Sequence, residues 1–275
     1  MKKEKIILAA VILFSTFGLV HAREGELSGT VDLKYLSSYI WRGFDMYPGA
    51  HGEGATQFSL DLDLFGTGFG MNVLSSRANT SGFEESEELD LTLSYSGTLG
   101  EGEACATNIK VGWMYYNHPD APRDAGVTGR NLMPGGDMQE VFASFSWPEV
   151  CSAGVVPSYT LIHMWPSESK TTTTLSDISG WAHVFGLGYD WIVSGLLQEI
   201  PEQAIHLSVE TIYNDGMGRA GVDHDWSHAV FGISTDFEIV ENLNVTPGLY
   251  RQDSWEDSVN TSDETWVSLS VNYTF

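Results

Sequence analysis

Residues 264–275 read E-T-W-V-S-L-S-V-N-Y-T-F, and their side chains alternate between two kinds. One set is apolar or aromatic: Val267, Leu269, Val271, Tyr273 and Phe275. Apart from Trp266, the intervening residues are polar. A period of two predicts a β-strand with one apolar face and one polar face. The sequence therefore predicts a strand that continues to the last residue and ends on an aromatic side chain.

This stretch resembles the C-terminal signal strand of bacterial outer-membrane β-barrels. In those proteins the insertion machinery reads a terminal Phe and an aromatic residue two positions earlier, which here are Phe275 and Tyr273. The resemblance implies that the barrel-assembly machinery, outer-membrane lipid and lipopolysaccharide are partners. A soluble exported β-sandwich that ends on an edge strand is the alternative, because alternation alone does not separate a polar lumen from a polar outer surface.

The first 22 residues have the features of a secretory signal peptide. Lys2, Lys3 and Lys5 precede an apolar run over residues 6–20, and Val20-His21-Ala22 supplies the small residues of a cleavage site. The run is too short, and has the wrong flanks, for a membrane-spanning helix. We expect residues 1–22 to be cleaved and residues 23–275 to form one domain in the outer membrane of a Gram-negative bacterium.

The remaining chain divides into about twelve alternating segments. They are residues 27–41, 55–65, 69–77, 87–99, 107–117, 138–147, 154–165, 181–193, 204–214, 226–238, 243–252 and 264–275. Short connections alternate with longer polar ones, as periplasmic turns alternate with extracellular loops. The prediction is an all-β fold: a closed antiparallel transmembrane β-barrel of about 12 strands with both termini periplasmic. Pro157 and Pro247 fall inside predicted strands, where proline removes a ladder donor, so the register near them stays open.

Most of the nine tryptophans lie at the ends of predicted strands, namely Trp41, Trp147, Trp165, Trp181, Trp191, Trp226, Trp255 and Trp266. This placement predicts aromatic girdles at the two membrane interfaces. A carbohydrate-binding stack is the functional alternative.

The formal net charge of −24 argues against nucleic-acid partners and against docking on an anionic membrane surface. Ten charged residues fall on the polar face of the strands and are candidates to line a pore: Asp32, Lys34, Asp61, Asp63, Asp90, Lys110, Glu140, Asp190, Glu210 and Asp236. Eight acids against two bases predict an acidic lumen that prefers cations if it conducts. Alternatively they are hydrated filler in a plugged barrel. Lys34 is expected near Asp61 or Asp63.

Residues 37–43 read S-S-Y-I-W-R-G. This segment resembles the opening of the TorF-type porin family, proteobacterial outer-membrane barrels of unknown function, whose first strand ends in a Ser-Asp-Tyr-x-aromatic-Arg-Gly pattern. Ser38 stands where the family usually has Asp. Residues 88–95 also look like that family, and the match covers about the first third of the chain plus the terminal strand. The resemblance implies an outer-membrane barrel with a channel role and carries over Tyr39, Arg42 and Gly43 as motif positions.

From its position, the Arg42-Gly43 pair is expected at the extracellular rim, where the first strand leaves the membrane. There Arg42 would pair with a loop acid and pack the loop, or would remain a solvated charge at the rim.

Cys105 and Cys151 are the only cysteines, and both lie at the periplasmic ends of neighbouring predicted strands. In an oxidising compartment this placement predicts a disulfide rather than a metal site.

Motifs for catalysis are weak. His206-Leu207-Ser208 resembles the His-x-Ser pair of some outer-membrane acyl-cleaving barrels but lacks the Asn that follows it there. Residues 223–225 and the acidic stretch 253–264 lack calcium-loop spacing, and phosphate-loop and nucleophile-elbow motifs are absent. We expect no enzyme, no catalytic residues, no cofactor and no metal.

The predicted function is passive diffusion of small cationic or neutral solutes through an outer-membrane porin. Two alternatives remain beside it: a non-conducting structural or surface-binding barrel, and an outer-membrane hydrolase.

Overall fold

The computed structural model describes residues 25–49, 54–120, 137–167, 179–194, 202–218 and 221–275. The expected signal peptide and its cleavage site lie outside the described residues. No helix in the described ranges is long and apolar enough to cross a membrane.

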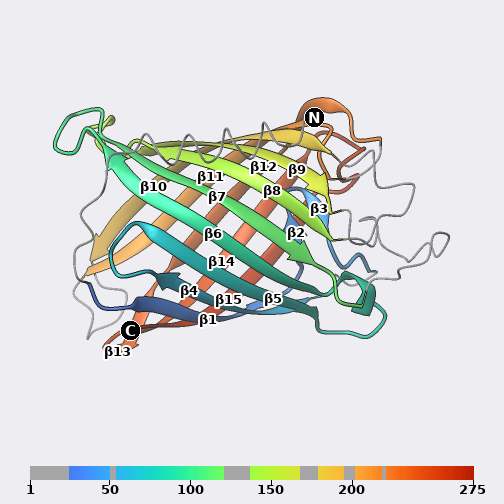
Figure 1. The fold of residues 1–275 in the computed structure, drawn as a ribbon, viewed down its shortest axis with the longest axis horizontal. Coiled ribbons are helices and arrows are strands. Elements are labelled where there is room, and N and C mark those ends of the chain that lie inside the picture. The colour runs from blue at the N-terminus through green and yellow to red at the C-terminus, as the bar shows by residue number, and fades with distance from the viewer. Residues whose placement is uncertain (1–24, 50–53, 121–136, 168–178, 195–201, 219–220) are drawn as a thin grey trace, which may run out of the picture.

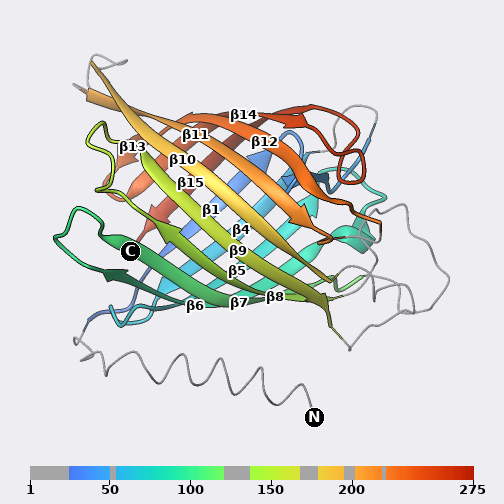
Figure 2. The same ribbon diagram turned by 90° about the horizontal axis from the view of Figure 1, so that it is seen from above.

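Twelve long strands in the described chain form one closed antiparallel barrel (Figures 1 and 2). They are β1 (Ser28–Leu36), β4 (Ala55–Asp63), β5 (Phe69–Ala78), β6 (Glu88–Leu99), β7 (Thr107–Asn117), β8 (Met138–Ser146), β9 (Val156–Pro166), β10 (Gly180–Ser194), β11 (Glu202–Asp215), β12 (His224–Thr235), β14 (Leu243–Ser254) and β15 (Glu264–Thr274). The remaining elements are β2 (Ile40–Trp41), β3 (Phe44–Asp45), β13 (Phe237–Val240) and the short 3₁₀ helix η1 (Glu84–Ser86). The predicted fold class is confirmed.

The first and last strands close the barrel. β1 pairs with β15 from Thr30 opposite Thr274 to Leu36 opposite Ser268. Beyond the ladder, the Gly29 N–H donates to the Phe275 carbonyl at 3.0 Å, and the Phe275 N–H donates to the Gly29 carbonyl at 2.9 Å. β12 and β14 pair in the same way, so the sheet has no free edge. Closure of this kind satisfies the backbone groups that lipid cannot.

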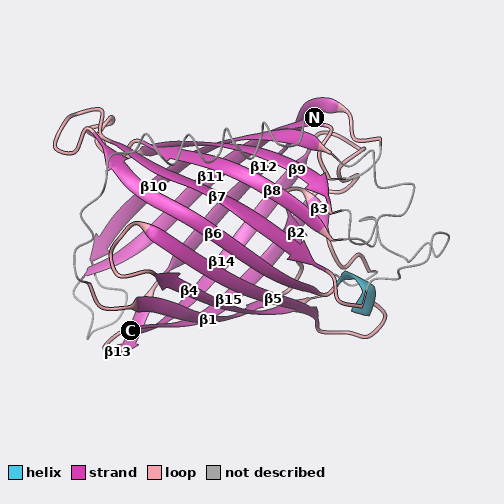
Figure 3. Ribbon diagram, in the orientation of Figure 1, coloured by secondary structure: helices cyan, strands magenta, loops and turns pink. Residues whose placement is uncertain are grey.

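The barrel has two unlike ends (Figure 3). At one end, which we call the turn end, Ser28 and Phe275 lie together beside short connections such as residues 64–68. The other end carries the longer connections, including residues 37–54, and we call it the loop end. The strands are tilted relative to the barrel axis, so the strands of the near and far walls cross in Figure 2.

The alternation of side chains separates an outer face from an interior. On each strand, every second side chain points outward. The large exposed apolar residues on this outer face include Leu33, Phe58, Leu93, Leu187, Phe231, Leu249 and Leu269. Tyr273 and Phe275 lie on the same outer face and are each 47% exposed. The opposite parity, rich in Ser, Thr, Gly and Asp, faces inward. The apolar set predicted in residues 264–275 is therefore the outer face of β15.

The two prolines lie where the ladders stop. Pro157 pairs with Leu187 on β10, but the β8 ladder ends one position away at Ser158. Pro247 pairs with Leu269 on β15, and on its other side it falls where the partner changes from β12 to β13. Each proline thus lacks a donor where a neighbouring ladder ends or is broken, which is why the sheet tolerates it.

The tryptophan prediction is wrong for two positions. Trp181, Trp191, Trp226 and Trp255 are exposed, as a girdle requires. Trp266, however, is only 8% exposed and has the inward parity. Trp41 lies in β2, which is not part of the barrel wall.

Adjacent positions on β6 test the two faces. Leu93 is exposed on the outer face, and Ser94 lines an interior cavity. We expect Leu93→Lys to destabilise the barrel in lipid vesicles by about 2–4 kcal/mol, because a lysine at membrane depth is costly. Ser94→Lys adds the same side chain to the lumen and should have a much smaller effect. Denaturant unfolding of both variants in vesicles measures the difference, and equal effects would contradict this assignment of faces.

Candidate functional site

The segment after β1 forms a hairpin of its own instead of continuing the wall. The first strand was expected to reach Trp41, but β1 ends at Leu36. β2 and β3 then pair with Ile40 opposite Asp45 and Trp41 opposite Phe44. The two residues between them have positive φ, 48° at Arg42 and 92° at Gly43. This is the geometry of a type I′ turn, which matches the twist of paired strands. We call residues 39–47 the inner hairpin.

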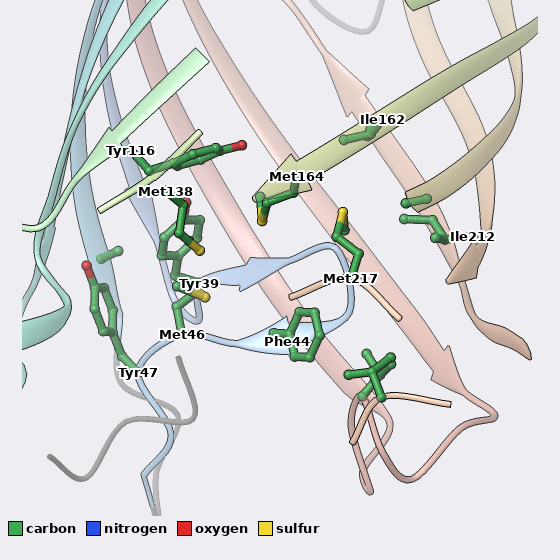
Figure 4. Close-up of a cluster of buried hydrophobic side chains, with 14 of the residues drawn as sticks. Tyr39, Phe44, Met46, Tyr47, Tyr116, Met138, Ile162, Met164, Ile212 and Met217 are labelled. Carbon is green, nitrogen blue, oxygen red and sulfur yellow. The ribbon is translucent and has the colours of Figure 1, made fainter. Parts of the chain in front are cut away.

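The inner hairpin lies inside the barrel at the loop end (Figure 4). Phe44 and Tyr47 are fully buried, and Tyr39 and Met46 are nearly so. Three methionines and two isoleucines from the wall and the loops pack in the same cluster: Met138, Met164, Met217, Ile162 and Ile212. Methionine fills irregular gaps, so this seat can adapt to the hairpin.

The inner hairpin contacts opposite sides of the ring. Trp41 packs edge-on against Tyr116 of β7, with ring centroids 5.7 Å apart. On the other side, Gln252 of β14 donates from Nε2 to the Gly43 carbonyl at 3.1 Å. β7 and β14 are six strands apart in the closed order of twelve, which is half the circumference. Strands ~4.8 Å apart and tilted ~40° give a barrel about 24 Å across, so the hairpin crosses its full width.

Arg42 anchors the hairpin to the wall. Its guanidinium donates from Nη1 and Nη2 to the two carboxylate oxygens of Glu140, at 2.7 and 3.0 Å. The Tyr116 hydroxyl donates to the same carboxylate at 2.8 Å. Burial disfavours the charge on Arg42, but the Glu140 carboxylate outweighs this and holds the pKa of Arg42 above its ordinary value. The Arg42 guanidinium also lies 4.7 Å from the Trp41 ring centroid, in cation–π contact.

The expected place of Arg42 is therefore wrong in one respect. It pairs with an acid, as one of the two expectations held, but the partner is on the wall strand β8 and not in a loop. The side chains of Arg42 and Glu140 are 18% and 2% exposed, so the pair lies within the barrel. Tyr39 and Gly43 lie with it in the inner hairpin and not at a solvated rim.

Gly43 has no room for a side chain. A Cβ at this position would lie 2.6 Å from Nδ1 of His228 and 2.8 Å from Cγ1 of Val259. Its carbonyl accepts a second hydrogen bond from Nδ2 of Asn260 at 3.1 Å. The positive φ and this close approach together explain why glycine occupies the turn.

The hairpin seals one half of the lumen. Glu88 and Asp90 point inward from β6 beneath it and are 4% and 1% exposed. The Glu88 and Asp90 carboxyl groups are hydrogen-bonding neighbours, with the Tyr39 hydroxyl beside Glu88 and the Asn117 backbone beside Asp90. Burial of two neighbouring acids is costly, so the sealed half carries an electrostatic penalty.

The other half, toward the turn end, is open. Asp61, Asp63 and Lys110 are exposed there and line a cavity of about 330 Å³. A second cavity of about 530 Å³ is lined by Asp63, Lys110 and several serines. The two aspartates thus face an accessible interior, whereas Asp90 on the neighbouring wall does not.

All ten charged residues chosen from the sequence have the inward parity. Asp32 and Lys34 lie together, with 3.4 Å between Oδ2 and Nζ. The expected approach of Lys34 to Asp61 or Asp63 is wrong, because the register sets Lys34 opposite Gln57. Asp61 lies four residues farther along β4 than Gln57 and is therefore not beside Lys34.

Asp190 and Asp236 converge on one histidine. His206 Nδ1 lies 2.7 Å from Asp190 Oδ1, and Nε2 lies 3.2 Å from Asp236 Oδ2. The Thr246 hydroxyl also donates to Asp236. Because carboxylates occupy both ring nitrogens, His206 has none left to activate Ser208, and the His-x-Ser motif forms no catalytic pair here.

The expected disulfide is absent, and Cys105 and Cys151 are free thiols. The ladder between β7 and β8 ends at Asn108 opposite Ser146. Cys105 lies three residues before that pair and Cys151 five residues after it, so each belongs to its own turn. Placement on neighbouring strands brought the two turns to the same end but did not bring the thiols together. The described residues hold no cluster of three or more metal-ligating side chains.

Comparison with known proteins places the fold. No protein-family model and no curated protein sequence matches the chain. The NanC porin is similar over 88% of this chain and 98% of its own, at 8% identity and a TM-score of 0.52. The KdgM porin in complex with disordered oligogalacturonate covers 90% and 99% of the two chains, at 10% identity and a TM-score of 0.47. An outer membrane channel from Pseudomonas putida F1 is similar over 92% of this chain and 96% of its own, at 10% identity and a TM-score of 0.48.

Removal of Arg42 tests the anchor. Arg42→Ala leaves the Glu140 carboxylate buried without its cation, which weakens the closed arrangement by about 3–5 kcal/mol. We expect faster chymotrypsin cleavage at Phe44 and Tyr47, which are buried in the parent protein, and a lower unfolding temperature. Arg42→Lys should lie between, because it keeps the charge and loses the two-pronged geometry.

The matched control is Arg251→Ala, which removes an exposed ion pair with Asp253 and Asp263 on the outer face. Cleavage at the hairpin should be unchanged in this variant. Equal protection of Phe44 in Arg42→Ala and in the parent protein would contradict the anchoring role of the buried pair.

Proposed function

We propose that this chain is an outer-membrane channel for small cationic or neutral solutes, with passage restricted by the inner hairpin. The observation that carries the proposal is the open half of the lumen, whose accessible wall is acidic and which ends beneath the hairpin. The barrel has the fold of an outer-membrane porin, and that likeness supports the outer membrane as its location and channel activity as its class.

Charge gives the direction of selectivity. Asp61, Asp63 and Glu210 are accessible from the lumen and form no ion pair with another described residue. Asp190 and Asp236 are 66% and 51% exposed and share one histidine. The positive charges on the same inner face are Lys110 and Lys34, and Lys34 is paired with Asp32. A low-dielectric wall focuses the field of these acids, so cations concentrate in the lumen and anions are repelled.

The finer family assignment is also part of the proposal. We assign the chain to the TorF-type porin family on the motif in residues 37–43. Its three motif positions Tyr39, Arg42 and Gly43 share one structural task, since all of them build the inner hairpin. The turn end is then periplasmic, the loop end is extracellular, and the first 22 residues are the export signal.

The principal alternative is a barrel that does not conduct. The contacts of the hairpin with β7 on one side and β14 on the other favour it, because they span the lumen. A closed barrel of this kind would serve as a structural or surface-binding protein. The same experiment separates the two functions.

Planar-bilayer recording under a salt gradient is that experiment. We expect discrete conductance steps and a reversal potential of the sign for cations. The double substitution Asp61→Asn and Asp63→Asn removes two lumenal charges and should shift the reversal potential toward zero, because fewer fixed charges attract cations.

Asp253→Asn is the control, since Asp253 lies outside the lumen in an exposed pair with Arg251. It removes the same kind of charge and should leave selectivity unchanged. Anion selectivity would refute the acidic filter, and an inserted but silent barrel would select the non-conducting alternative.

A further inference from the structure

A pocket lies directly beneath the inner hairpin. Its volume is about 430 Å³, and it is formed by the inner faces of β11, β12, β14 and β15. Ile40, Arg42 and Gly43 of the hairpin form its roof. Gly186 and Gly188 on β10 widen it, and no atom lies within 4 Å of the position that a Cβ of Gly188 would take.

Two aromatic rings form one wall of this pocket. Tyr250 and Trp266 stack with their centroids 5.4 Å apart and their planes 15° apart. The Tyr250 ring lies over two glycines, because a Cβ on Gly232 or Gly248 would come within 2.9 Å of it. The glycines thus leave room for the Tyr250 ring beside the wall, where it stacks on Trp266 and lines the pocket.

A carboxylate lies across from the rings. Glu210 on β11 lines the pocket, is exposed to it, and forms no ion pair with another described residue. The register sets Glu210 opposite Val230, one rung from Gly232 and Tyr250. Two strand spacings of ~4.8 Å and an offset of two residues place Glu210 and Tyr250 about 12 Å apart at the backbone, with Val230 and Gly232 of β12 between them. The space between carboxylate and ring suits a small organic group.

Two buried polar atoms of the lining residues have no hydrogen-bond partner within the described chain, and both are acceptors. Ser227 donates its one hydroxyl hydrogen to the Ile212 carbonyl at 3.1 Å, so at 2.8 Å it accepts from Nδ1–H of His228. In the neutral ring this leaves Nε2 of His228 as a lone pair, and it has no partner. Gln252 donates both Nε2 hydrogens, to Gly43 and Ser254, and its Oε1 is also unpaired. His228 and Gln252 are at least 99% buried.

Charge, acceptors and aromatic faces call for the same kind of ligand. Arg42 attracts both Glu140 and Glu210, and these three groups together leave one net negative charge at the pocket. A primary ammonium group brings three donors and a positive charge, and its alkyl part can lie on the rings with the cation near their faces. We infer that this pocket binds small organic ammonium solutes, with Glu210 as the counter-ion and Tyr250 and Trp266 as the aromatic wall.

This inference rests on the proposed function, because it names the class of cation that the lumen receives. It also explains why two large rings and a carboxylate face the interior just below the hairpin. A ring that served only to cover Gly232 and Gly248 would need no free carboxylate opposite it.

Isothermal titration calorimetry on the full barrel in detergent tests the pocket without any need for conduction. The probes are n-butylammonium chloride, its neutral analogue 1-butanol, and glucose. We expect n-butylammonium to bind and 1-butanol to bind at least tenfold more weakly. Glu210→Gln should weaken n-butylammonium binding roughly tenfold, the equivalent of one lost charge-assisted contact of about 1.4 kcal/mol. Tyr250→Leu should weaken it about two- to fivefold, whereas Tyr250→Phe keeps the ring and retains most of the binding.

Asp253→Asn is again the matched control and should bind like the parent protein. Circular dichroism and the heat-dependent mobility shift of the folded barrel check that each variant is folded. Equal affinity for n-butylammonium and 1-butanol, an unchanged affinity in Glu210→Gln, or preferential binding of glucose would each overturn the inference. A barrel that conducts cations without binding n-butylammonium would refute the pocket alone. A barrel that binds n-butylammonium and stays silent in bilayers would refute the proposed channel alone.

Discussion

The buried ion pair between Arg42 and Glu140 is the interaction on which the inner arrangement depends. A pair this deeply buried contributes little net stability compared with apolar groups of the same size, because both charges lose their hydration. What it supplies is position. The two-pronged contact admits one orientation of the guanidinium, and the Tyr116 hydroxyl fixes the carboxylate that receives it. The type I′ turn, the seat of methionines and the contacts of Gly43 with the opposite wall all follow from that placement.

The hairpin divides one chemically uniform wall into two environments. Asp61 on β4 and Asp90 on β6 both point into the barrel and have the same side chain, yet Asp61 is exposed in an open cavity and Asp90 is buried against another acid, Glu88. Solvent reaches the acids in the open half and hydrates their charges. In the sealed half the acids gain nothing from solvent, so their burial opposes the closed position of the hairpin. Closure is thus a balance between the Arg42 anchor with its apolar seat and the sealed carboxylates.

Sequence periodicity was sufficient for the wall and insufficient for the lumen. Twelve alternating segments could be recognised because each strand of a barrel has one face toward lipid and one inward, but alternation does not fix the register between neighbouring strands. Alternation carries no information about a segment that leaves the wall. Residues 39–41 are a short aromatic and apolar run that extended the predicted strand, and only the Arg42-Gly43 pair between Trp41 and Phe44 marks a two-residue turn. Contacts between non-neighbours were also out of reach, which is why the wall partner of Arg42, the neighbours of Lys34 and the free state of Cys105 and Cys151 were missed.

The roof of the pocket and the anchor of the hairpin share a residue, and this couples occupancy to closure. Arg42 is bonded to Glu140 and also lines the pocket that contains Glu210. A solute in this pocket changes the electrostatic environment of Arg42 in the closed position and not in a displaced one. By linkage, it can shift the hairpin only by the difference between its affinities for the two positions. A cation repelled by the guanidinium favours displacement, whereas a solute that fills the space beneath Gly43 without added charge favours closure. If the hairpin has a second position, the sign of the coupling therefore follows from the charge of the solute.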